Sequence, residues 1–144
     1  MISTKGRYAL RMMVDLAQHQ GEGNISLKDI AQRQEISKKY LEQIIPILHR
    51  ASLLNTSRGA SGGYQLAKPP EDYTVGEIIR ATEGSLAPVS CLEKNINTCP
   101  RCSECATLFV WEGLQKLENE YFDSITLQDI LDKQVSGSGT NYNI

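Results

Sequence analysis

The sequence predicts a mainly α-helical protein with a small β-hairpin: a winged helix-turn-helix domain followed by a long C-terminal dimerisation helix. Three observations predict this class. Helix-start signals recur along the 144 residues, two short helical segments stand close together near residue 30, and a glycine-rich turn separates two extended stretches. A helix-turn-helix followed by a β-hairpin is the order of elements in a winged helix.

Most helix starts carry one local signal: an apolar residue, a Ser or Thr cap, and a second apolar residue about one turn later. The cap oxygen accepts a hydrogen bond from a first-turn N–H, and the two apolar residues pack together. Thr74 and Glu77 also predict a full capping box. Helices are therefore expected to begin near residues 27, 38, 75 and 127, after Ser26, Ser37, Thr74 and Thr126.

The N-terminal elements follow in order from these signals. We expect helices over residues 3–20, 27–33 and 38–50, then extended stretches at 53–57 and 64–67. The second helix and the cap of the third are separated by three residues, as in a helix-turn-helix. Pro46 lacks an N–H and its ring crowds the carbonyl one turn earlier, so we expect a kink or a widened turn there.

The C-terminal half predicts three further helices, at 75–83, at 104–122 and from about 127. The apolar stripe of the 104–122 helix is too wide for one partner. Its members are Leu108, Phe109, Val110, Trp111, Leu114, Leu117, Tyr121 and Phe122. We expect this helix to pack against its copy in a homodimer, with packing on its own N-terminal domain as the alternative. The Ser/Gly/Asn-rich tail from Val135 is expected to be disordered.

Charge is divided unevenly along the chain. Residues 1–68 carry ten Lys/Arg against five Asp/Glu, whereas residues 69–144 carry five against twelve. A basic half suggests contact with a polyanion, although chance and solvated helix faces give the same balance. No stretch approaches a membrane span and the N-terminus lacks a signal-peptide core, so we expect a cytoplasmic protein with no membrane partner.

The helix after Ser37 has the residues of a DNA-reading helix. The first residues of a recognition helix reach base edges in the major groove. Lys39 can donate to guanine, Gln43 can pair with adenine, and Glu42 can accept from cytosine. A solvated helix face is the alternative. The candidate contacts here are Lys38, Lys39, Tyr40, Glu42 and Gln43.

The glycine-rich turn after this helix predicts a wing. An arginine presented on a hairpin can enter a narrow minor groove or hold phosphates. The candidate wing contacts are Arg58, Gly59, Ser61, Gly62 and Tyr64. With two recognition helices in a dimer, the expected partner is double-stranded DNA carrying a palindromic promoter site.

All four cysteines of the chain, Cys91, Cys99, Cys102 and Cys105, lie within fifteen residues. Thiolates are ligands for iron–sulfur clusters and for zinc. Zinc ribbons usually have two well-separated C-x2-C pairs, whereas the pairs here overlap at Cys102, so zinc is the lesser alternative. A disulfide switch at Cys99 and Cys102 is a further alternative. The alternative class of protein is a thiol or zinc-binding adaptor that does not bind DNA. The sequence shows no Cys/His or Ser/His/Asp set that would support catalysis, so we do not expect an enzyme.

Three motifs together resemble one family. They are the segments at 3–10, at 36–43 and at 58–64, and the likeness continues through 75–79 and 125–127. The chain resembles the Rrf2 family of bacterial regulators, most of all its IscR-like branch. The resemblance implies a homodimeric winged-helix regulator, with DNA contacts at Lys39, Glu42, Gln43 and Arg58.

The resemblance also implies an iron–sulfur cluster, with [2Fe–2S] favoured over [4Fe–4S], on Cys91, Cys99 and Cys105. The fourth ligands of known branches are missing, because Leu108 and Arg7 stand at the matching positions. Cys102 is the natural replacement, with Glu93 and Glu104 as alternatives. A CymR-like branch, which controls cysteine metabolism through a partner enzyme, generally lacks the cysteine trio.

The chain therefore divides into four expected segments. Residues 1–68 form a winged helix-turn-helix DNA-binding domain, and 69–103 a connector helix with a cysteine-rich sensor loop. Residues 104–134 form the dimerisation and terminal helices, and 135–144 a disordered tail. The expected function is a sequence-specific transcriptional regulator that senses cluster status or redox state.

Overall fold

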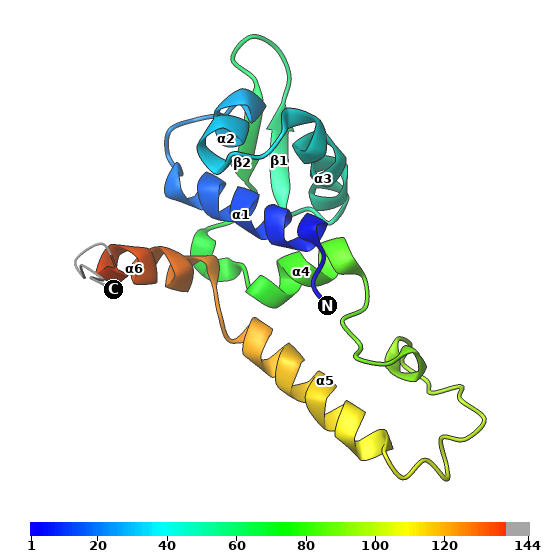
Figure 1. Cartoon of the computed structure of the whole chain (residues 1–144). Helices are drawn as coiled ribbons and strands as arrows, with labels where there is room; N and C mark the ends of the chain where they lie inside the picture. Colours follow the sequence, from blue (N-terminus) through cyan, green and yellow to red (C-terminus); the bar gives the residue numbers. More distant parts are fainter. Residues whose placement is uncertain (138–144) are drawn as a thin grey trace.

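The computed structural model describes residues 1–137 of the chain. A helical domain with one hairpin forms the upper part, and a long helix extends away below it (Figure 1). The elements are α1 (Thr4–Gln18), α2 (Leu27–Gln34), α3 (Lys38–Arg50), β1 (Leu54–Ser57), β2 (Gly63–Leu66), η1 (Pro70–Asp72), α4 (Val75–Glu83), η2 (Ser90–Leu92), α5 (Leu108–Asp123) and α6 (Leu127–Gly137). The predicted class, mainly helical with a winged helix-turn-helix, is confirmed.

The predicted caps form. Ser26, Ser37 and Thr74 each accept a hydrogen bond from the N–H three residues later, over 3.1, 3.1 and 3.0 Å. Such a bond satisfies one of the free N–H groups of a first turn, which explains why these helices begin where the sequence places them.

The capping box expected at Thr74 is only half made. Glu77 donates its N–H to Thr74, but its carboxylate accepts from Lys68 Nζ at 2.8 Å instead of returning to the cap. The reciprocal box forms at Thr126 and Asp129, with bonds of 2.9 and 3.0 Å. The ion pair with Lys68, nine residues earlier in the sequence, therefore replaces the bond that the Glu77 carboxylate would make to the Thr74 N–H.

Two expected details are corrected. The helix α5 begins at Leu108 rather than at 104, because the chain before it forms successive tight turns. The helix α6 includes residues 135–137, which were expected to be disordered, and the remaining tail lies outside the described residues. The helix α3 continues through Pro46, which is exposed, and the kink or widened turn expected there stays a prediction.

One apolar core joins α1, α2, α3, β1 and α4, and burial of its side chains supplies the main driving force for folding. Its fully buried large members are Met12, Met13, Leu16, Ile30, Leu41, Ile44, Leu48, Leu53, Leu54, Tyr73, Ile78 and Leu127. Leu127 is the first residue of α6, so this helix returns to the domain after α5. By contrast, α5 has no buried residue. No helix within residues 1–137 is both long and apolar enough to cross a membrane.

The strands β1 and β2 form an antiparallel hairpin in which Leu54 pairs with Leu66 and Ser57 with Gly63. Residues 58–62 make the loop at the tip of this hairpin, which we call the wing. The wing projects from the top of the domain beside α2 (Figure 1).

Candidate nucleic-acid interface and cysteine loop

The N-terminal half of α3 exposes most of the predicted base-contacting residues. Lys38, Lys39, Glu42 and Gln43 are exposed, so all four are free of the core. Tyr40 differs because it is half-buried and packs edge-on against Tyr8, with ring centroids 5.2 Å apart. The structure therefore gives Tyr40 a packing role beside any contact with DNA.

The turn between α2 and α3 is held by a buried carboxylate of α1. Asp15 is fully buried and accepts hydrogen bonds from Arg33 Nε at 3.0 Å and Arg33 Nη2 at 2.7 Å. Gln34 Nε2 donates to the same carboxylate at 3.0 Å. This hydrogen bonding raises the pKa of Arg33. Sequence reasoning did not find Asp15, whose signal is an acid among the apolar positions of the first helix.

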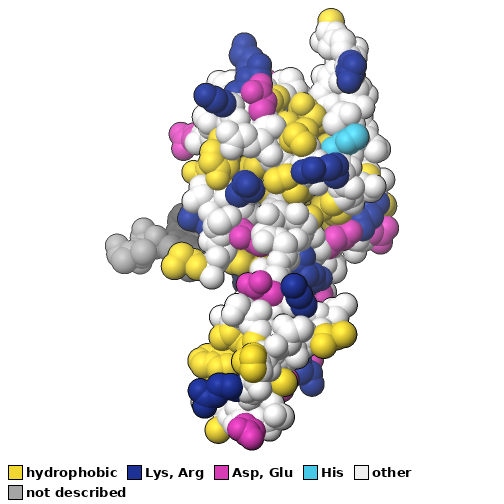
Figure 2. Space-filling model, turned by 90° about the vertical axis from the view of Figure 1, so that its right-hand side faces the viewer, with side chains coloured by type: hydrophobic (Ala, Val, Ile, Leu, Met, Phe, Trp, Pro, Cys, Tyr) yellow, Lys and Arg dark blue, Asp and Glu magenta, His cyan; other side chains and the backbone are white. Residues whose placement is uncertain are grey.

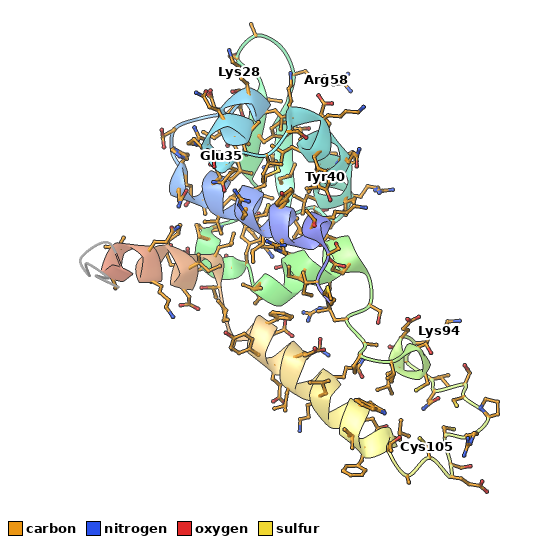
Figure 3. All side chains as sticks on the ribbon, in the orientation of Figure 1. Lys28, Glu35, Tyr40, Arg58, Lys94 and Cys105 are labelled. Carbon is orange, nitrogen blue, oxygen red and sulfur yellow. The ribbon has the colours of Figure 1, made fainter. Side chains whose placement is uncertain are left out.

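Two cationic side chains lie near the hairpin, one from the wing and one from α2. Arg58 of the wing and Lys28 of the first turn of α2 both lie at the hairpin end of the molecule (Figure 3). Both are exposed, as are Gly59 and Ser61, whereas Gly62 and Tyr64 are half-buried. Lys28 was not among the predicted contacts, although an exposed lysine just after the Ser26 cap was visible in the sequence.

Charged and apolar side chains both occur on the upper and the lower part of the face in Figure 2. Lys and Arg side chains are spread over the upper, domain part of the face in Figure 2, including the end that bears the hairpin. Hydrophobic side chains also gather on the lower part, which protrudes from the domain.

The cysteines lie along the loop that joins α4 to α5. Cys91 belongs to η2, the N–H of Cys102 donates to the carbonyl of Cys99 at 3.1 Å, and Cys105 precedes α5. Three of them are half-buried, and Cys105 is exposed. Within residues 1–137 no three Cys, His, Asp or Glu side chains are gathered as a metal site.

Four thiols on one exposed loop nevertheless have the donor chemistry that an iron–sulfur cluster requires. The Cys105 Sγ lies 3.6 Å from Thr107 Oγ1. The pKa of the Cys105 thiol is lowered, chiefly by hydrogen bonding to the Thr107 hydroxyl and then to backbone N–H groups, with a contribution from Arg101. A thiol whose pKa is lowered is more readily present as the thiolate that binds a metal. The set fits a cluster chemically, and binding requires the loop to bring the thiols together.

A cavity lies beside part of the loop that carries the cysteines. A polar cavity of about 600 Å³ separates the segment 92–97, which lies between the first two cysteines, from α5. One hydrogen bond crosses between them, from Gln115 Nε2 to the Leu92 carbonyl at 3.2 Å. The Asn97 Nδ2 on the cavity wall is buried without a hydrogen-bond partner among the described residues.

Comparison with known proteins places this arrangement in a family. The family model "Rrf2: Iron-dependent Transcriptional regulator" matches residues 2–133. The chain belongs to the Rrf2 family. Protein rrf2 from Nitratidesulfovibrio vulgaris is 43% identical over 130 residues, which are 90% of this chain and 86% of that protein.

Two solved structures in the Rrf2 family share the fold. CymR (YrzC), the global cysteine regulator of B. subtilis, has a TM-score of 0.75 and 39% identity, over 92% of this chain and 97% of that one. T. potens IscR has a TM-score of 0.73 and 44% identity, over 93% and 88%. The Rrf2 membership predicted from the motifs is confirmed. The chain is therefore a transcriptional regulator rather than an enzyme.

Proposed function

We propose that this Rrf2 regulator is a homodimer that binds a palindromic promoter site and holds an iron–sulfur cluster in its cysteine loop. The observation that carries the cluster is the gathering of all four cysteines on the loop between α4 and α5. The iron-dependent description of the family supports it.

The proposed dimer follows from the surface of α5. Phe109, Leu117 and Tyr121 are 73%, 66% and 64% exposed, and Val110 and Leu114 continue the same stripe. An apolar stripe of this length on a soluble helix indicates an interface. A second copy of α5 offers the matching surface, since a two-fold dimer contacts itself through one patch.

The proposed DNA contacts divide into two groups. Lys39, Glu42 and Gln43 on α3 read base edges in the major groove, as donors and acceptors of the matching types. Arg58 in the wing contacts the adjacent minor groove or phosphates. The exposure of all four side chains supports these roles.

For the cluster, we propose Cys91, Cys99 and Cys105 as ligands, with Cys102 as the fourth. A bound cluster supplies a group whose redox state and integrity respond to the cell. The loop connects directly to α4 and α5, so gathering the thiols changes the path of the chain between the DNA-binding domain and the proposed dimer helix.

An anaerobic visible spectrum with iron and sulfide analysis tests the cluster. We expect the wild-type protein to be coloured, with iron and sulfide in equal amounts. Cys91→Ala should abolish the colour, whereas Cys102→Ala should retain iron if Glu93 or Glu104 can replace it and lose iron if it cannot. Colourless wild-type protein without iron, after anaerobic purification, contradicts the proposal.

The second candidate function is a regulator that controls cysteine metabolism, as CymR does, and responds through a disulfide switch. Cys99 and Cys102 lie in one turn, and the fold matches CymR. Mass spectrometry after mild oxidation tests it. A Cys99–Cys102 disulfide that changes DNA affinity, in protein free of iron, favours the switch over the cluster, and Cys102→Ser should then abolish the response.

A further inference from the structure

The wing is attached to the segment that precedes α2, although 39 positions separate the two residues that pair. Ile25 and Tyr64 form an isolated antiparallel bridge in which each N–H donates to the other's carbonyl over 2.9 Å. The chain before α2 therefore lies beside β2 like a short third strand. Two backbone hydrogen bonds fix its register.

The side chain of Asn24 extends this attachment to the tip of the wing. Its Nδ2 donates to the Ser61 carbonyl at 3.1 Å, and its Oδ1 accepts from Gln65 Nε2 at 3.0 Å. One carboxamide thus contacts both the loop and β2. A carboxamide has a donor and an acceptor, and this pairing requires both.

Two glycines allow the chain to approach this closely. A Cβ at Gly63 would lie 2.4 Å from the Ile25 carbonyl oxygen, and a Cβ at Gly62 would lie 2.3 Å from the Ser57 carbonyl oxygen. Any other residue at either position would push the backbone apart. The backbone at the end of the wing therefore packs closely against Ile25 at Gly63 and against Ser57 at Gly62.

Arg58 is the first residue of this loop and is exposed. Its position depends on the path of the glycine-rich loop, because no hydrogen bond or ion pair holds its side chain within residues 1–137. A free loop of this composition has many conformations, and ordering each residue on binding costs roughly 1–2 kcal/mol. A loop already ordered in the free protein avoids that cost.

We propose that Asn24 is a positioning residue for DNA binding: its carboxamide fixes the wing so that Arg58 is presented to DNA in the free protein. The inference rests on the proposed contact of Arg58 with DNA. Asn24 acts through the wing and contacts no DNA itself. Nothing in the local sequence marks it, because its partners lie 37 and 41 residues away.

A double-mutant cycle between Asn24 and Arg58 tests this role. Affinity is measured for the full-length dimer on a duplex site selected in vitro by the wild-type protein. We expect Arg58→Ala to weaken binding about tenfold and Asn24→Ala about fivefold, while Asn24→Ala in the Arg58→Ala background weakens it less than about twofold. Asn55→Ala is the matched control, since Asn55 is an exposed asparagine on β1 of the same hairpin.

The outcomes separate the two proposals. If Arg58→Ala leaves the affinity unchanged, the proposed wing contact is wrong, and the role of Asn24 falls with it. If Arg58→Ala weakens binding but Asn24→Ala has no effect, or has its full effect in both backgrounds, the wing contact stands and the role of Asn24 is wrong.

A second variant and a second measurement guard against misfolding. Asn24→Asp keeps the acceptor for Gln65 and loses the donor to Ser61, so it should loosen the wing tip without exposing apolar surface. Hydroxyl-radical footprinting reads the minor groove. We expect Asn24→Asp and Arg58→Ala to lose the same minor-groove protection, and an unchanged footprint for a folded Asn24→Asp would overturn the inference.

Discussion

Asp15 is a carboxylate inside the apolar core, and its only described partners come from the end of α2. Replacing it with asparagine removes the charge that Arg33 pairs with and weakens the bonds to Gln34. We expect Asp15→Asn to lower the free energy of unfolding by about 2–3 kcal/mol, the usual loss for hydrogen bonds to charged groups. Urea denaturation measures it, with Glu35→Gln, an exposed neighbour, as a control expected to change little. An equal effect of both variants would contradict the role of Asp15.

Tyr73 is a second buried polar residue, and its hydroxyl serves three backbone groups. It accepts from the N–H of Ala67 at 2.8 Å and of Lys68 at 3.2 Å, and donates to the Leu53 carbonyl. We expect Tyr73→Phe to cost about 1–3 kcal/mol, because these buried groups lose their partner.

The pH dependence of this loss identifies its cause. Burial raises the pKa of Tyr73, so the folded protein favours the neutral phenol. Its contribution is complete below the unfolded pKa of about 10 and is lost as the pH rises through the folded pKa. The stability difference between wild type and Tyr73→Phe should therefore narrow above about pH 10. A difference that stays constant from neutral to alkaline pH would show that lost packing, and not the hydroxyl, is responsible.

These residues show which contacts a sequence can predict. The caps at Ser26 and Ser37 were predictable because each cap and its partner are three residues apart. Asp15 was not, because its partner Arg33 is 18 residues away, and the Tyr73 bond to the Leu53 carbonyl was not, because it spans 20 residues. Such partners are brought together only by tertiary packing. The candidate DNA contacts on α3 were predictable from composition, whereas the bonds of Asp15 to the end of α2 were not.

At the scale of elements, α4 links the DNA-binding domain to α5 through two charged side chains. Glu83 accepts hydrogen bonds from the Ser3 N–H at 2.9 Å and the Ser3 hydroxyl at 2.6 Å. One turn earlier, Arg80 donates to Asn119 and to Asp123 of α5. The glycine at residue 6 makes room for Glu83, since a Cβ there would lie 2.2 Å from its Oε1.

Gly6→Ala tests this fit. Alanine is the better helix former by about 1 kcal/mol, so an unpacked site would gain stability. We expect instead a loss of about 1–3 kcal/mol from the clash with Glu83. In a Glu83→Ala background the clash disappears, and Gly6→Ala should then be neutral or stabilising. Thermal unfolding of the four proteins measures the cycle, and additive effects would contradict the contact.

The start of a helix can be predicted from the sequence only where a local signal marks it. The start of α4 was predicted at residue 75 because a cap and a staple mark it, whereas α5 begins four residues later than predicted. Thr107 precedes α5 but its side chain makes no capping bond, so no local signal marked that end. The loop of cysteines was predictable from spacing, but its open path was not, because no hydrophobic pattern fixes it.

At the scale of the whole molecule, charge differs between the parts that carry the two proposed interfaces. The basic residues 1–68 include α3 and the wing, whereas the acidic half contributes α4 and Leu127 to the same core and includes α5, which extends away from the domain (Figure 1). We expect Leu117→Glu to place two buried charges in the proposed dimer interface and to raise the dimer dissociation constant at least about a hundredfold. Sedimentation measures the dimer dissociation constant. The control is Lys116→Glu, which introduces the same side chain at the adjacent, exposed position of α5 and should leave the dimer intact. A dimeric Leu117→Glu protein would exclude α5 as the interface.

Loss of the proposed dimer changes DNA binding in a way that distinguishes it from misfolding. Each wild-type dimer brings two sets of basic residues to the two half-sites, and counterion release makes log K fall linearly with log salt concentration in proportion to the phosphates contacted. A monomer keeps one intact domain and one half-site, so the Leu117→Glu protein should show about half the wild-type slope and about equal affinity for a half-site and a palindrome. Titration at several salt concentrations measures both quantities. Because the domain core lies outside α5, an unfolded variant would lose binding altogether, whereas an unchanged slope and palindrome preference would show that both half-sites are still bound together.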